Sequence, residues 1–124
     1  PPKITDLLLK IKMPYNVNVA ALVAVEESLK DIDYLKGNVK AIVNERARMF
    51  EELKKIKWLK TVPSHANFIL CKVEKGEAKR LKENLQQKGI LVRYFEEGRL
   101  KEYIRISVGK PEHTDTLIRV LAQL

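Results

Sequence analysis

The spacing of apolar residues along the chain predicts helices in some segments and strands in others. Apolar side chains recur every three or four residues in segments 4–11, 32–56, 77–88 and the stretch that begins at Pro111. Runs typical of strands occupy segments 67–73, 90–95 and 103–108. This order of elements predicts an α+β fold, in which a small, mainly antiparallel sheet has its helices packed on one side.

Residues with special backbone preferences indicate where the helices begin and end. Pro14 ends the first helix, because proline cannot continue it. A second helix begins near Val17, with Asn16 or Asn18 as its N-cap, since an asparagine side chain accepts a hydrogen bond from the free amides of the first turn. Gly89 follows the fourth helix at the position where a left-handed backbone ends many helices.

The second helix is apolar on every side from Val19 to Val25. A surface helix of a small domain needs only one apolar face, so this segment predicts burial against a surface that the chain does not contain. The apolar run is also far shorter than the roughly 20 residues that span a membrane. We therefore expect a protein contact here and no membrane partner.

The third helix, from about Ile32 to Ile56, has one apolar stripe and charged residues elsewhere. The stripe consists of Leu35, Val39, Ile42, Val43, Met49, Phe50, Leu53 and Ile56. Residues 61–64 then indicate a break before the first strand. That strand contains the run Phe68–Cys71, which is apolar on both faces and predicts a central position in the sheet.

Length and composition fit one globular domain, with 124 residues, 45% of them apolar and 32% charged. The net charge of +8 raises the question of nucleic-acid binding. Positive and negative residues are interleaved along the helices, however, which is typical of a solvated face with local ion pairs. Because no motif of interleaved basic and aromatic residues is present, we expect no nucleic-acid partner.

Cysteine and histidine are too scarce for several kinds of site. Cys71 is the single cysteine, which excludes an internal disulfide, and we interpret it as a small buried hydrophobic residue. The only histidines are His65 and His113, so the sequence offers no metal-ligand cluster and we expect no metal site. We interpret His65 as a loop residue and His113 as exposed.

The two late strands each carry an arginine on the face opposite to one apolar row: Arg93 shares its face with Leu91 and Phe95, and Arg105 shares its face with Tyr103 and Ser107. If the apolar faces pair, Ile104 lies opposite Tyr94, and Arg105 lies opposite Arg93. Like charges that face each other destabilise a sheet. The arrangement therefore favours an anion held by guanidinium groups, which grip carboxylates and phosphates at two points. An internal ion pair with a glutamate, or an exposed sheet face, are the alternatives.

Four motifs follow one another along the chain: PYNVN at 14–18, PSHANFIL at 63–70, GILVR at 89–93 and IRISVG at 104–109. In this order they resemble the histidinol-phosphate aminotransferases, a branch of the fold-type I, pyridoxal-phosphate-dependent aminotransferases of class I/II. The resemblance runs from about Ile4 to the C-terminus. The last motif is shared by many fold-type I enzymes, and the pentapeptide points to the histidinol-phosphate branch.

The resemblance implies a domain division, a reaction and partners. Residues 1–18 would form an interdomain helix and hinge, and residues 19–124 the small domain of an aminotransferase. The full enzyme would transfer an amino group between histidinol phosphate and 2-oxoglutarate (forming glutamate) through pyridoxal 5′-phosphate, in histidine biosynthesis. It would be a homodimer in the cytoplasm, or in the plastid of a plant.

By position, the resemblance assigns four residues to substrate binding. Arg105 corresponds to the arginine that binds a substrate carboxylate and helps with the phosphate end of histidinol phosphate. Arg93 corresponds to a second contact at the phosphate end. Tyr15 and Asn16 fall in the hinge segment that lines the entrance of the active site.

The family's Schiff-base lysine and its cofactor-binding residues precede the hinge, and no lysine here has the family's serine–lysine context. We therefore expect no catalytic residue and no bound cofactor in this chain, a large domain as its missing partner, and no activity of the chain alone. Two alternatives are a stand-alone module that binds an acidic metabolite or partner, and the small domain of a sister enzyme such as an aromatic aminotransferase or a phosphothreonine decarboxylase.

Overall fold

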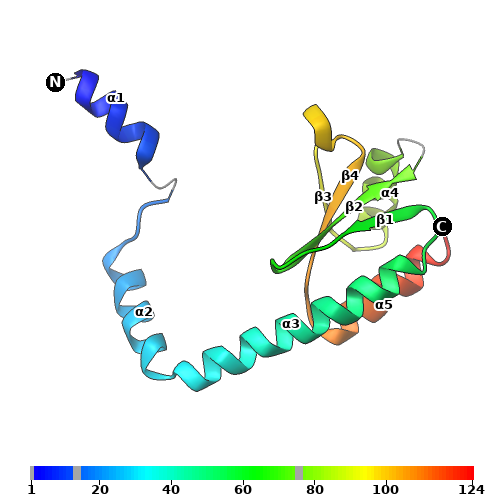
Figure 1. Cartoon of the computed structure of the whole chain (residues 1–124), viewed down its shortest axis with the longest axis horizontal. Coiled ribbons are helices and arrows are strands. Elements are labelled where there is room, and N and C mark those ends of the chain that lie inside the picture. Colours follow the sequence, from blue (N-terminus) through cyan, green and yellow to red (C-terminus); the bar gives the residue numbers. More distant parts are fainter. Residues whose placement is uncertain (1, 13–14, 75–76) are drawn as a thin grey trace. The chain divides into compact units, whose positions relative to one another are not determined.

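The computed structural model describes residues 2–12, 15–74 and 77–124 (Figure 1). Its elements are α1 (Pro2–Ile11), α2 (Val19–Lys30), α3 (Ile32–Lys54), β1 (Leu59–Val62), β2 (Phe68–Val73), α4 (Ala78–Gln87), β3 (Arg93–Tyr94), the 3-10 helix η2 (Gly98–Leu100), β4 (Tyr103–Ser107) and α5 (Pro111–Leu121). Contacts within the chain group residues 1–36 into one unit and residues 37–124 into another. The boundary after residue 18 that the resemblance implies stays a prediction.

The first unit contains α1 and α2. Helix α2 begins at Val19, slightly later than predicted, because the Asn18 side chain accepts a hydrogen bond from the Ala21 amide at 2.8 Å and caps the helix. The sequence offered Asn16 or Asn18 as the N-cap, and the structure has Asn18 in this position. No described residue of α1 or α2 is buried, so burial of segment 19–25 against another surface stays a prediction. Pro14, predicted to end the first helix, lies outside the described residues.

The long helix α3 begins at Ile32 as predicted and ends slightly before the predicted position. Its buried residues are Glu45, Met49 and Leu53. Burial of Glu45 corrects the prediction that charged residues lie only outside the apolar stripe. Because a buried carboxylate without a partner is costly, this position requires a cation close by.

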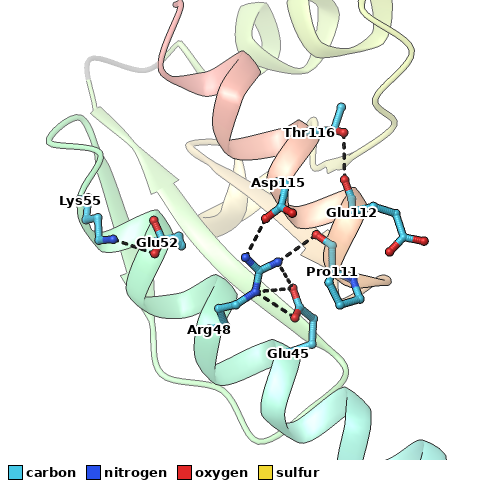
Figure 2. Close-up of polar contacts among 8 residues, drawn as sticks. All are labelled: Glu45, Arg48, Glu52, Lys55, Pro111, Glu112, Asp115 and Thr116. Carbon is cyan, nitrogen blue, oxygen red and sulfur yellow. Dashed lines mark hydrogen bonds and ion pairs between the residues drawn. The ribbon is translucent and has the colours of Figure 1, made fainter.

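Arg48 is that cation, and it joins α3 to the start of α5 (Figure 2). Its Nε and Nη2 atoms donate to the Glu45 carboxylate at 2.8–3.2 Å. Its Nη1 donates to Asp115 Oδ1 at 2.7 Å, and Nη2 also donates to the Pro111 carbonyl oxygen at 2.9 Å. The Arg48 guanidinium lowers the pKa of Glu45, although burial acts in the opposite direction, and Glu45 raises the pKa of Arg48.

Within the described residues, the sheet has four strands in the order β1-β2-β4-β3, and every neighbouring pair is antiparallel. This confirms the predicted antiparallel sheet and the central place of β2. Strand β1 was not predicted, because the sequence indicated a break at residues 61–64. Leu59 pairs with Val73 and Thr61 with Cys71, so β1 does alternate, but four residues are too few to reveal a period of two.

The opposite edge strand, β3, contains only Arg93–Tyr94, whereas the sequence predicted a strand over 90–95. The Ile90 amide donates to the Leu85 carbonyl oxygen at 2.9 Å, which keeps the chain at the end of α4. Gly89 makes this return possible with a φ of 77°, the left-handed conformation predicted for it. Strand β3 is therefore short, and it begins at Arg93.

Buried apolar side chains from the strands and from α3, α4 and α5 form one core. The core residues are Leu59, Ile69, Cys71, Val73, Ile104 and Ile106 of the strands, and Met49, Leu53, Ala78, Leu81, Leu85, Leu117 and Leu121 of the helices. The prediction of helices packed on one side of the sheet is confirmed. Trp58 is partly buried and packs against this core. Burial raises the pKa of Cys71 to about 12, so this thiol is a poor nucleophile.

Candidate anion-binding site

The face of the sheet that is turned away from the core, here called the open face, has no buried residue. Its residues alternate with those of the core and are Lys60, Val62, Phe68, Leu70, Lys72, Arg93, Tyr103, Arg105 and Ser107. The strand register aligns four of them in one row across the sheet, in the order Val62, Leu70, Arg105 and Arg93. The row thus passes from apolar side chains on β1 and β2 to two arginines on β4 and β3.

Arg93 and Arg105 lie directly opposite each other, which confirms the predicted register, as does the pairing of Tyr94 with Ile104. Arg105 is half-buried and Arg93 is exposed. Neither arginine forms an ion pair with any residue that the structure describes. Within this part of the chain, the alternative of an internal ion pair with a glutamate is therefore wrong.

Each arginine lies over a phenylalanine ring instead. Arg105 Cζ is 5.2 Å from the centroid of the Phe68 ring, and Arg93 Cζ is 5.7 Å from that of Phe95. A ring face attracts the cation but takes none of the N–H donors that lie in the guanidinium plane. Neither ring was assigned a role from the sequence, although Phe95 lies two residues from Arg93, on the same face of the predicted strand.

The two lysines of the open face are paired with glutamates. Lys72 Nζ lies 3.0 Å from Glu102 Oε2, and Lys60 Nζ lies 3.3 Å from Glu74 Oε1. The hydrogen bond to Glu102 raises the pKa of Lys72. Among the described residues, the cations of this face that lack a counter-charge are therefore the two arginines.

The loop between β1 and β2 fixes the strand end that carries Phe68. Ser64 Oγ donates to the Phe68 carbonyl oxygen at 2.5 Å and accepts from the Ala66 amide at 3.1 Å. Arg46 Nη1 donates to the Ala66 carbonyl oxygen at 3.0 Å and ties the loop to α3. The motif at 63–70 thus forms one end of the open face. The hydrogen bond from Arg46 on α3 holds this loop in place.

Arg93 also lines a hollow of about 460 Å³, together with Tyr94, Phe95, Glu96 and Glu97. The two glutamates bring negative charge to this hollow, so the hollow by itself is an unfavourable place for an anion. Arg105 does not line this hollow, and its neighbour in the row on β2 is the apolar Leu70.

The other predicted site residues belong to the first unit. Tyr15 and Asn16 lie between α1 and α2, and the Tyr15 side chain is 86% exposed. Their contact with a substrate stays a prediction. In the second unit, His65 and His113 are exposed.

No group of three or more metal-ligand residues occurs among the residues described. In the same residues, no helix combines the length and the apolar character needed to cross a membrane.

The chain matches the family model for aminotransferase class I and II over residues 1–123. It is 50% identical to the histidinol-phosphate aminotransferase of Dehalococcoides mccartyi over 124 residues, which are 100% of this chain and 35% of that protein. The chain thus spans about a third of the length of this curated relative.

Two solved structures are also similar. The first is the histidinol-phosphate aminotransferase from Clostridium acetobutylicum, with a TM-score of 0.79 and 29% identity over 90% of this chain and 34% of that one. The second is the enzyme of the same name from Sinorhizobium meliloti in complex with pyridoxal-5′-phosphate, with a TM-score of 0.76 and 26% identity over 98% of this chain and 35% of that one. The α+β fold described above is therefore that of a known enzyme family, and the chain belongs to the class I and II aminotransferases.

Proposed function

We propose that this chain is the C-terminal small domain of a histidinol-phosphate aminotransferase and that it supplies the arginines that bind the substrate anions. The full enzyme transfers an amino group between histidinol phosphate and 2-oxoglutarate. The observation that carries the proposal is the pair Arg93 and Arg105, which face each other on the open face without a counter-charge among the described residues. The 50% identity to a histidinol-phosphate aminotransferase supports this choice of substrates.

The two arginines suit substrates that carry a carboxylate or a phosphate. Arg105 lies on a central strand and is half-buried beside Leu70, so it binds the carboxylate that must be held in one orientation. Arg93 lies on the edge strand and is exposed, which suits the phosphate end of histidinol phosphate. Like charges at opposite positions of two strands are unfavourable, and a bound dianion offsets this cost.

Pyridoxal phosphate supplies the electron sink for amino transfer when it is bound to the full enzyme. Among the residues that the structure describes, no lysine fits its covalent anchor. That anchor is a lysine held in a buried site with a lowered pKa. The described lysines are exposed or half-buried, and the pKa of Lys72 is raised. We therefore assign the cofactor to the remainder of the enzyme and propose that the chain alone is inactive.

The proposal is tested by Arg105→Lys in the full-length enzyme. Lysine keeps the charge but loses the planar two-point grip on an oxyanion. A lost charge-assisted contact is worth about 1.5–3 kcal/mol, so kcat/KM should fall roughly 10- to 100-fold in both half-reactions. Arg93→Lys should lower kcat/KM for histidinol phosphate more than for 2-oxoglutarate.

Arg99→Lys is the matched control, because Arg99 is exposed on η2 and outside the arginine pair. Its kcat/KM should stay close to that of the wild type, and circular dichroism should show that all variants are folded. If Arg105→Lys left both half-reactions unchanged, Arg105 would be a structural residue and the proposed site would be wrong.

A further inference from the structure

We propose that Phe68 is a positioning residue, which holds the Arg105 guanidinium in one orientation so that its N–H donors are directed at the bound anion. The inference rests on the proposed function, because it assumes that Arg105 binds a substrate carboxylate. It adds a residue outside the arginine pair, and it explains how a long and flexible side chain is kept in one orientation before the substrate arrives.

Phe68 and Arg105 come from neighbouring strands of the open face. Phe68 pairs with Ser107, and Arg105 pairs with Leu70, so the two side chains are diagonal neighbours. The guanidinium carbon lies 5.2 Å from the ring centroid. An arginine that lies over a ring retains its five donors, all in one plane, for a carboxylate or phosphate.

The ring itself is attached to a well-supported part of the backbone. Ser64 Oγ donates to the Phe68 carbonyl oxygen at 2.5 Å, and the Val108 amide donates to the carbonyl oxygen of Asn67 at 2.8 Å. Strand β2 has a partner strand on either side, and the Phe68 side chain is half-buried. A support that is already ordered reduces the side-chain entropy that Arg105 loses when the anion binds.

The second ring does not support its arginine in the same way. Arg93 Cζ lies 5.7 Å from the Phe95 ring, but Phe95 follows on the same edge segment, just after the end of β3. A ring on the same segment moves together with its arginine. Arg105 is therefore the fixed contact of the pair and Arg93 the adaptable one.

The test uses the full-length enzyme with Phe68→Leu, which removes the ring but keeps an apolar side chain, and Phe68→Tyr, which keeps the ring. We expect KM for 2-oxoglutarate to rise about 5-fold in Phe68→Leu, with a smaller change in kcat, because the lost contact is a cation–aromatic one. Phe68→Tyr should restore KM to within about 2-fold of the wild type, since the ring face is retained. Phe68→Met replaces Phe68→Leu if that variant does not fold.

Phe50→Leu is the matched control. Its ring lies 5.5 Å from Lys54 Nζ on α3, is half-buried and belongs to no part of the proposed site. A double variant then separates positioning from packing: when Arg105→Met has removed the cation, Phe68→Leu should raise KM no further, because Phe68 acts through Arg105.

The outcomes separate this inference from the proposed function. If Arg105→Lys raises KM for 2-oxoglutarate but Phe68→Leu raises it no more than Phe50→Leu does, the positioning role is wrong and the proposed function stands. Equal losses in Phe68→Leu and Phe68→Tyr, or additive losses of Phe68→Leu with Arg105→Met, show a packing role and also overturn the inference. If Arg105→Lys has no effect, the proposed function fails, and the inference fails with it.

Discussion

Arg48 and Arg105 lie on opposite sides of the same sheet, and their surroundings differ. On the helix side, Arg48 donates to Glu45, to Asp115 and to the Pro111 carbonyl oxygen, as Figure 2 shows. On the open face, Arg105 lies over a ring and has no anionic partner among the residues described. The first guanidinium uses its donors to join two helices, whereas the second has a ring as its neighbour and no carboxylate among the described residues.

The same contrast holds for neighbouring residues of one strand. Ile104 is fully buried and pairs with Cys71 and Tyr94, whereas Arg105, the next residue, points to the open face. Alternation along β4 thus places one set of side chains in the core and the other set on the open face. We expect a substitution on the core side to change mainly the free energy of unfolding. A substitution on the open face should change mainly the binding of a ligand.

The largest effect on stability is expected from Ile104→Ala. This change leaves a cavity among buried strands and helices and should lower the free energy of unfolding by about 2–5 kcal/mol. Leu70→Ala is the matched change on the open face, and it should cost roughly half as much or less, because Leu70 is only half-buried. Urea unfolding of the two variants, followed by circular dichroism, measures the difference. Equal losses would show that the open face is part of the core.

The sequence was sufficient to predict the parts of the fold that depend on local spacing. The alternation over 103–108 placed Arg105 on one face and Ile104 on the other, and pairing the apolar faces then set Arg105 opposite Arg93. The buried stretch of β2 was recognisable because its residues are apolar on both faces. The helix boundaries at Asn18 and Pro111 followed from capping preferences.

Features that depend on two distant segments were not predictable from local spacing. Arg48 pairs with Glu45 on the same helix, but it also donates to Asp115, 67 residues further along the chain, and that contact between α3 and α5 cannot be read from local spacing. The Phe68 ring beneath Arg105 requires the register between β2 and β4, whereas only the register between the last two strands was derived. The edge strand β1 exists because β2 offers it a partner, and its own four residues carry too weak a pattern.

The next largest effect is expected when the pH is lowered, because stability depends on the ion pair of Glu45 and Arg48 on the helix side of the sheet. The Arg48 guanidinium holds the pKa of Glu45 below its ordinary value of 4.5 in the folded chain. A carboxyl whose pKa is lowered on folding stabilises the fold above its unfolded pKa, and this contribution is lost as the pH falls through the folded value. The urea midpoint should therefore fall between about pH 5 and pH 3, and this fall should be smaller in Glu45→Gln.

Asp115→Asn is the control, because Asp115 is exposed and contacts the same guanidinium. Its pH dependence should stay closer to that of the wild type. If Glu45→Gln and the wild type lost stability in parallel as the pH fell, the Glu45 carboxylate would not be stabilised by Arg48 in solution.

The smallest effects are expected where the chain leaves β4 and enters α5. A Cβ atom at Gly109 would lie 2.7 Å from His113 Nδ1 and 3.2 Å from His113 Cβ. That nitrogen accepts a hydrogen bond from the Lys110 amide at 3.3 Å, so Gly109→Ala should displace the imidazole and remove this contact at the start of the helix. Loss of such a cap costs about 1 kcal/mol, which a shift of the urea midpoint would measure.

Gly37→Ala is the opposite case and the control for Gly109→Ala. Gly37 lies within α3, and a Cβ atom there meets no other atom within 4 Å. Alanine is the better helix former, so this change should stabilise the chain by about 0.5–1 kcal/mol. The two glycines should therefore shift the urea midpoint in opposite directions. If both changes stabilised the chain, His113 would move aside without loss, and the turn from the open face into α5 would not depend on this close contact.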